Sequence, residues 1–195
     1  MTTIGVSGYG ISPTRLYTYV GNDPLDKTDP TGNDAYVERD KDKIVITIPV
    51  KYAGVADSKT AEQKFAKAVE SKLSGKIGKY DVTTKVTAAK DGDAHANTVS
   101  FDKKGSDTPS EVVGGKEMSL NTESKGIKWN ERQHEAGHLA GMKDHYSDNG
   151  KSGSERATTP EAGWRGNIMG ELPGSFGQRN IDEVLESPNN VVTNK

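Results

Sequence analysis

Cysteine is absent from the 195 residues of this chain, and apolar residues are scarce. Without cysteine there is no disulfide, no thiolate nucleophile and no Cys-ligated zinc, so His, Asp and Glu are the only side chains left to bind such a metal. The apolar fraction is 31%, well below the roughly 45–50% typical of globular chains. We therefore expect one domain of ordinary size, with part of the length outside the packed core.

Three further absences limit the function. No run of 18 apolar residues is present, so no membrane span is expected. The net charge is only -2, and no basic stripe alternates with aromatic residues, which argues against a nucleic-acid partner. The opening MTTIGVSGYGISPT has neither a charged n-region nor an apolar h-region, so no signal peptide is expected in it.

Periodic apolar patterns begin at residue 43, after a stretch rich in Gly, Pro, Asp and Thr. KIVITIPV predicts an interior strand, because β-branched residues alternate from Ile44 to Ile48. An amphipathic helix is expected next, capped by Thr60 and stopped by Gly75. The remaining patterns predict strands at YDVTTKVTAA, NTVSFD, EVV and EMSLN, a helix over about 127–140, a Gly/Ser-rich loop over 147–166 and a final helix at IDEVLE. This order predicts an α+β or mixed α/β fold.

Three of the four histidines lie in HEAGHLAGMKDH, residues 134–145, whereas His95 lies in a polar loop and is expected to be solvated. Positions i and i+4 share one face of an α-helix, so His134 and His138 can direct two imidazoles at one ion. This is the HExxH spacing, in which Glu135 can take the proton of a metal-bound water without being a ligand. Zinc lowers the pKa of that water from 15.7 to about 7, so the glutamate can generate hydroxide near neutral pH and later protonate the leaving amine.

The residues after the helix offer a third ligand. Gly141 lies where the helix must end in a sharp turn, a step that often needs positive φ. That turn can bring Asp144 beside the two imidazoles, which leaves the fourth position of a tetrahedral ion to water. His145 is the rival third ligand. A glutamate from a later segment is a further alternative, namely Glu155, Glu161 or Glu171.

The pattern HExxHxxGxxD, followed by Gly166-Asn167-Ile168-Met169-Gly170, resembles the metzincin clan of zinc peptidases and its Met-turn. The continuation Asp144-His145-Tyr146-Ser147 is most similar to the snapalysin-type metalloproteases, although most metzincins have histidine in place of Asp144. The resemblance implies a zinc peptidase with a twisted mixed sheet, an active-site helix, a Met-turn beneath the metal and a C-terminal helix. It also implies an edge strand that holds the substrate extended, for which EVVGGKEMSLN is the candidate.

Two residues of this region have a structural alternative. Met169 would be the Met-turn methionine, but methionine is often simply core filler. Tyr146 is a candidate for stabilising the oxyanion of the tetrahedral intermediate, and a packed aromatic side chain is the alternative.

LYTYVGNDPLDKTDPTG, residues 16–32, resembles the end of the core of Rhs-repeat proteins, which closes on a DPxG motif, here Asp29, Pro30 and Gly32. The resemblance implies a core shell around a C-terminal toxin domain, release of the toxin by cleavage just after the motif, and a neutralising immunity protein. We expect cleavage between Gly32 and Asp34, so that residues 1–33 end the core and residues 34–195 form the toxin. A turn-rich leader without function is the alternative.

Together these patterns predict a zinc endopeptidase of the polymorphic toxins that serve interbacterial competition. It would leave the producing bacterium as part of a larger secreted protein and cleave a protein in a target cell. One alternative is a non-catalytic binding toxin whose metal only stabilises the fold. A nuclease toxin is another, and the missing basic groove argues against it.

Overall fold

A computed structural model of the chain describes residues 35–54, 58–102, 111–113, 117–121, 129–150 and 157–195. The chain divides after Pro30 into two units, and all of the described residues belong to the second, Thr31–Lys195. The DPxG motif with Asp29, Pro30 and Gly32 lies outside the described residues, as does Glu155. No helix in the described part of the chain is long and apolar enough to cross a membrane.

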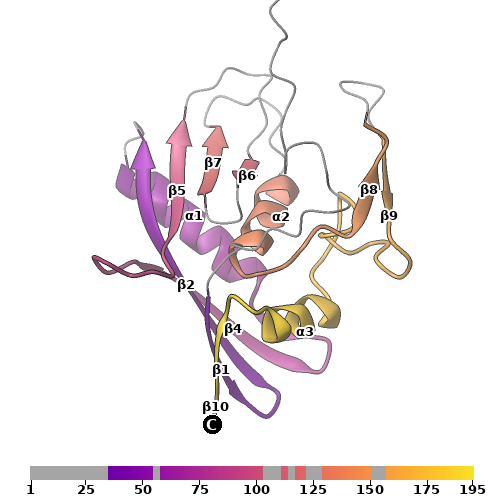
Figure 1. Cartoon of the computed structure of the whole chain (residues 1–195), viewed down its shortest axis with the longest axis horizontal. Coiled ribbons are helices and arrows are strands. Elements are labelled where there is room, and N and C mark those ends of the chain that lie inside the picture. The colour runs from indigo at the N-terminus through magenta and orange to yellow at the C-terminus, as the bar shows by residue number, and fades with distance from the viewer. Residues whose placement is uncertain (1–34, 55–57, 103–110, 114–116, 122–128, 151–156) are drawn as a thin grey trace, which may run out of the picture. The chain divides into compact units, whose positions relative to one another are not determined.

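The described residues form a mixed α+β fold around a twisted mixed sheet, which confirms the predicted α+β class (Figure 1). The central strand β2 pairs antiparallel with β1 and parallel with β4 and β5. The sheet continues in parallel from β5 to β7, and the short strand β6 closes this edge antiparallel to β7. The strands are β1 (Tyr36–Asp40), β2 (Lys43–Gly54), β4 (Tyr80–Ala88), β5 (Asn97–Asp102), β6 (Glu111–Val113) and β7 (Glu117–Asn121).

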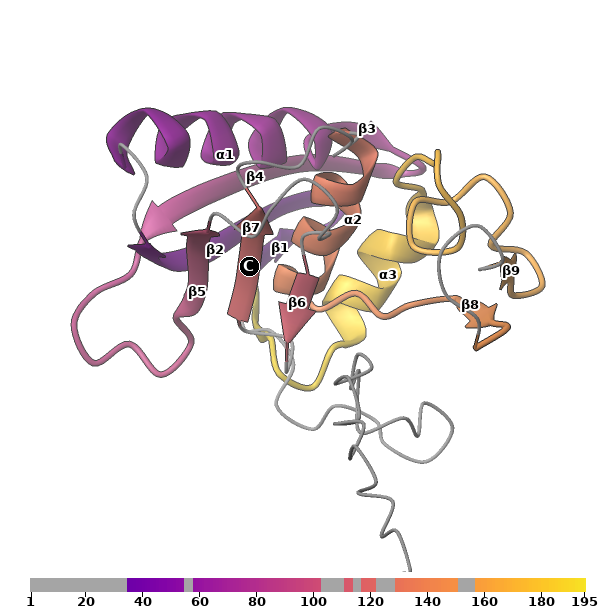
Figure 2. The ribbon, with the colours of Figure 1, turned by 90° about the horizontal axis from the view of Figure 1, so that it is seen from above.

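The helix α1, Ser58–Lys72, connects β2 to the parallel strand β4 and covers one face of the sheet (Figure 2). Ile44, Ile46 and Ile48 alternate along β2 and are almost fully buried. On α1, residues that are four positions apart face the sheet together, and Phe65 and Val69 are buried there. Each such side chain contributes about 1.5–3 kcal/mol when fully buried, which explains why the two periodic patterns pack together.

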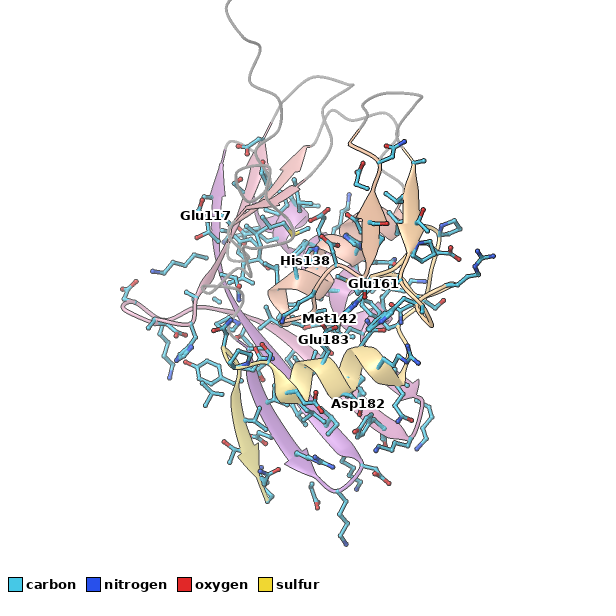
Figure 3. The ribbon with its side chains drawn as sticks, turned by 45° about the vertical axis from the view of Figure 1, so that its right-hand side comes forward. Glu117, His138, Met142, Glu161, Asp182 and Glu183 are labelled. Atoms are coloured by element: carbon cyan, nitrogen blue, oxygen red, sulfur yellow. The ribbon has the colours of Figure 1, made fainter. Side chains whose placement is uncertain are left out.

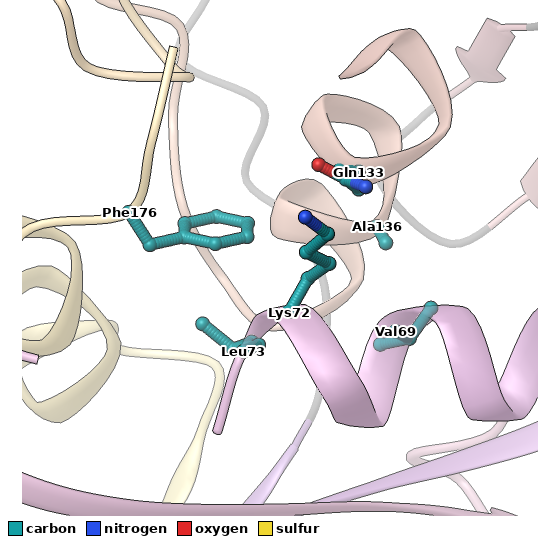
Figure 4. Close-up of a pocket in the computed structure, with 6 residues that line it drawn as sticks. All are labelled: Val69, Lys72, Leu73, Gln133, Ala136 and Phe176. Carbon is teal, nitrogen blue, oxygen red and sulfur yellow. The ribbon is translucent and has the colours of Figure 1, made fainter. Parts of the chain in front are cut away.

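Helix α2, Trp129–Leu139, lies beside α1, and Figure 4 shows a small hollow between them that is lined by Leu73, by Ala136 of α2 and by the ring of Phe176. Helix α3, Gln178–Glu186, follows, and β10, Val191–Asn194, then pairs in parallel with β1. The side chain of Asn190 joins these elements. Its amide donates to the carbonyls of Ala140 (3.0 Å) and Val184 (2.8 Å), and its oxygen accepts from the backbone N–H of Ala35 (2.8 Å).

Several boundaries differ from the sequence-based expectations. Helix α1 begins at Ser58, so Thr60 is not its cap, and Gly75 opens a short strand, β3 (Gly75–Ile77), at φ +106°. The expected loop over 147–166 contains an antiparallel hairpin, made of β8 (Tyr146–Asp148) and β9 (Thr158–Pro160). The strands β3, β8 and β9 have 3 residues each, too few to show a period, and the patterns do not predict them. His95 is half-buried, with its ring edge-on to Tyr36 at 5.3 Å, and is not simply solvated.

Candidate metal centre

Helix α2 carries the HExxH residues and ends just before Gly141. Gly141 has φ +91°, so the predicted turn through positive φ is confirmed. A Cβ at this position would lie 2.8 Å from Ser187 Oγ and 2.9 Å from Asn190 Nδ2. Both the backbone angle and the packing therefore require glycine where the chain turns toward Asp144.

The structure brings His134, His138 and Asp144 together. The Oδ1 atom of Asp144 lies 3.0 Å from His134 Nε2 and 3.4 Å from His138 Nε2, and the three ligand atoms all lie within 4.8 Å of one another. Ligands about 2.0–2.2 Å from a tetrahedral zinc ion are roughly 3.3–3.6 Å apart, which is close to the two separations involving Asp144. This group could therefore hold a metal ion.

Backbone carbonyls orient both imidazoles. His134 Nδ1 donates to the carbonyl of Ile168 (2.8 Å), and His138 Nδ1 donates to the carbonyl of Met142 (2.9 Å). A carbonyl oxygen can only accept, so each Nδ1 carries a proton and the neutral ring keeps its lone pair on Nε2. With neutral rings, Asp144 Oδ1 is a buried oxygen without a hydrogen-bond donor. Three lone-pair atoms thus face one point, an arrangement that a cation satisfies.

The electrostatics of the metal-free group also favour a positive charge. Burial of Asp144 favours the neutral acid, but the imidazoles of His134 and His138 outweigh burial and hold the carboxyl pKa well below its usual range. Burial likewise disfavours a charged His138, yet Asp144 and, more weakly, Glu135 and the Met142 carbonyl raise its pKa to about 9. The site therefore binds a proton tightly, and a metal ion must displace that proton.

The segment Gly166–Gly170 forms a tight turn beneath α2. The backbone N–H of Gly170 donates to the carbonyl of Asn167 (2.9 Å), and the N–H of Met169 donates to Asn167 Oδ1 (2.9 Å). Met169 is fully buried, and a Cβ built on Gly137 would lie 2.6 Å from its sulfur. Met169 therefore packs on the stretch of α2 between the two histidines, while the preceding carbonyl, of Ile168, orients His134.

His145 points away from the other two histidines. Its Nδ1 lies 2.8 Å from Glu161 Oε2, its Nε2 lies 3.0 Å from Glu183 Oε1, and its ring stacks on Trp164 at 3.5 Å. Burial lowers the pKa of His145, but Glu183 and Glu161 outweigh burial and raise it. Figure 3 shows both glutamates near the end of α2, one from a loop and one from α3. Of the other predicted ligands, Glu171 accepts the N–H of Gly166 (2.7 Å).

Glu135 and Tyr146 lie close to the histidines. Glu135 is half-buried on α2, and its charge helps to raise the pKa of His138. The ring of Tyr146, at the start of β8, is 6.1 Å from the ring of His134 and tilted by 42°. The edge strand β6 lies against α2 (Figure 1), so part of the predicted rim EVVGGKEMSLN borders the helix that carries the candidate ligands.

No family model, curated protein or solved structure matches this chain.

Sequence reasoning missed the groups that hold the candidate ligands in place. The two carbonyls, of Met142 and Ile168, leave no sequence signal because every residue carries one. Glu183 and Trp164 belong to distant segments, and they contact His145 only once the chain has folded. Gly137 did carry a signal, since a glycine inside a helix usually has a packing reason.

Proposed function

We propose that residues 34–195 are a zinc-dependent endopeptidase with a metzincin-like, snapalysin-type site. One observation carries the proposal. The Nε2 atoms of His134 and His138 and the Oδ1 atom of Asp144 converge as lone-pair donors, with Glu135 next to the first of them on the same helix. Three ligands from this chain leave one position of a tetrahedral ion for water and substrate, which is the pattern of catalytic zinc sites.

In this proposal His134, His138 and Asp144 would hold the ion, and zinc bound there would lower the pKa of water to about 7 and polarise the peptide carbonyl. The Glu135 carboxylate would accept a proton from the attacking water while the water oxygen bonds to the carbonyl carbon. Glu135 then gives this proton to the amide nitrogen, and the C–N bond breaks. Tyr146 is the candidate for stabilising the oxyanion, because its ring lies beside His134.

An extended peptide suits the neighbouring sheet edge. Among the described strands, β6 is the last of the sheet on this side and lies against α2. A peptide that pairs with such an edge is held by backbone hydrogen bonds, so its scissile bond can be presented to the metal side of α2. This arrangement supports cleavage within a chain.

The toxin part of the proposal is supported by the Rhs-like stretch at residues 16–32 alone. In this part of the proposal, the endopeptidase is released after Asp29-Pro30-Thr31-Gly32, acts on a protein of a target cell, and is held inactive in the producer by an immunity protein.

The main alternative to the endopeptidase is the binding toxin, in which the metal has only a structural role. A structural zinc ion would be closed by four protein ligands, but both ring nitrogens of His145 contact carboxylates outside the group.

Growth of a bacterium expressing the chain tests the proposal. The chain should arrest growth, and Glu135→Ala should abolish the arrest while the purified variant keeps its zinc. His134→Ala should lose both zinc and arrest, whereas Glu186→Ala, which removes an exposed carboxylate of α3, should change neither. Arrest by both the native chain and Glu135→Ala would support the binding toxin. If neither arrests growth, the toxin assignment fails.

A further inference from the structure

We propose that His145 is a positioning residue, which fixes Asp144 where its carboxylate can serve as the third metal ligand. The inference rests on the metal centre of the proposed function. It assigns His145 a part in that centre although its ring does not face the ligand group.

The ring of His145 is held on three sides. Glu161 contacts Nδ1 at 2.8 Å, Glu183 contacts Nε2 at 3.0 Å, and Trp164 stacks on one face, with the two ring planes at 3°. The backbone of His145 is held as well. Its N–H donates to the carbonyl of Met169 (2.8 Å), and its carbonyl accepts from the N–H of Glu161 (2.8 Å). A side chain fixed at so many points cannot move without carrying its backbone along.

Glu183 holds the chain on both sides of Asp144. Its Oε1 atom accepts from the backbone N–H of Lys143 (3.2 Å) and lies against Nε2 of His145 (3.0 Å). One carboxylate of α3 thereby anchors the residue before the candidate ligand and the residue after it. The short segment between is then positioned relative to α3 and to the turn that contains Met169.

Asp144 needs such an anchor more than the other two candidate ligands do. The imidazoles of His134 and His138 stand on a helix, and a backbone carbonyl orients each ring. Asp144 follows the end of α2, and its carboxylate contacts the two imidazoles themselves. Its position is therefore set through the backbone of its neighbours. Residues that orient a metal ligand typically change metal affinity about 10–100-fold when they are removed.

Cobalt and zinc affinities, measured on the whole chain by competition with a chromophoric chelator, test the inference. His145→Ala should weaken binding of both ions about 10–100-fold. Glu183→Ala should do the same by a different route, because it releases both flanking residues. His95→Ala removes a histidine that contacts Tyr36, and it should leave the affinity unchanged. Circular dichroism of the metal-free variants establishes which of them are folded, and Glu183→Ala provides the test if His145→Ala does not fold.

A double-mutant cycle separates positioning from a general structural role. If His145 acts through Asp144, then adding His145→Ala to Asp144→Ala should change the affinity by no more than about twofold, which is the margin within which independent effects usually add. An equal loss in both backgrounds would mean that His145 only supports the fold, and it would overturn the inference. Full affinity in folded His145→Ala and Glu183→Ala would also overturn it. If the native chain binds neither ion, the metal centre of the proposed function fails too.

Discussion

Replacing Gly137 with alanine tests whether the helix that carries the candidate ligands rests on Met169. The new Cβ would lie 2.6 Å from the sulfur of Met169 and 3.2 Å from that of Met142, whereas unstrained contacts are about 3.5–4.0 Å. Overpacking of this kind costs about 1–3 kcal/mol, and alanine recovers about 0.8–1.0 kcal/mol over glycine as a helix former. We expect the free energy of unfolding to fall by up to about 2 kcal/mol.

The sign of this effect should reverse when Met169 is shortened. Met169→Ala alone should cost about 2–5 kcal/mol, because it leaves a cavity in the core. In that background both close contacts with Met169 are gone and the 3.2 Å approach to the Met142 sulfur remains, so Gly137→Ala should raise stability by up to about 1 kcal/mol. Urea unfolding of the four metal-free chains measures the cycle. Equal destabilisation by Gly137→Ala in both backgrounds would refute the packing of α2 on Met169.

Two further predictions follow from the pKa shifts and from the hydrogen bonds. The His138 pKa is raised from 6.5 to about 9, so in the metal-free chain its contribution to stability is full below pH 6.5 and is lost as pH rises through 9. The Asp144 pKa is lowered, so its contribution is full above pH 3.8 and is lost on acidification. Zinc bound at this group would displace the His138 proton, so the gain in unfolding free energy from saturating zinc should grow between pH 6.5 and 9. A constant gain would contradict the proposed site. Asn190→Ala removes three hydrogen bonds and should lower the unfolding free energy by roughly 3 kcal/mol. The control Asn189→Ala should lower it by less than about 0.5 kcal/mol. Equal effects of the two substitutions would contradict the proposed role of Asn190.

The candidate ligands on α2 could be predicted because their relation is local. His134 and His138 are four residues apart, so any α-helix places them on one face, and Gly141 marks the turn that ends it. The interior strand and the amphipathic helix were equally readable, since alternating and four-residue spacings report the burial of one face. The predicted cap at Thr60 was wrong because α1 begins earlier, at Ser58, and the ends of a helix are what local patterns place least precisely.

The sequence by itself determined the class of fold, the pair of histidines and the point where their helix ends, because each depends on residues a few positions apart. It favoured Asp144 as the third ligand but left His145 and a later glutamate as alternatives. Only the tertiary structure groups Asp144 with the two imidazoles. Glu183 and Trp164 come from segments 19–38 residues further along the chain and occupy the ring of His145, while Asp144 is turned toward the imidazoles. Contacts between such distant segments depend on how the whole core packs, and no local pattern encodes them.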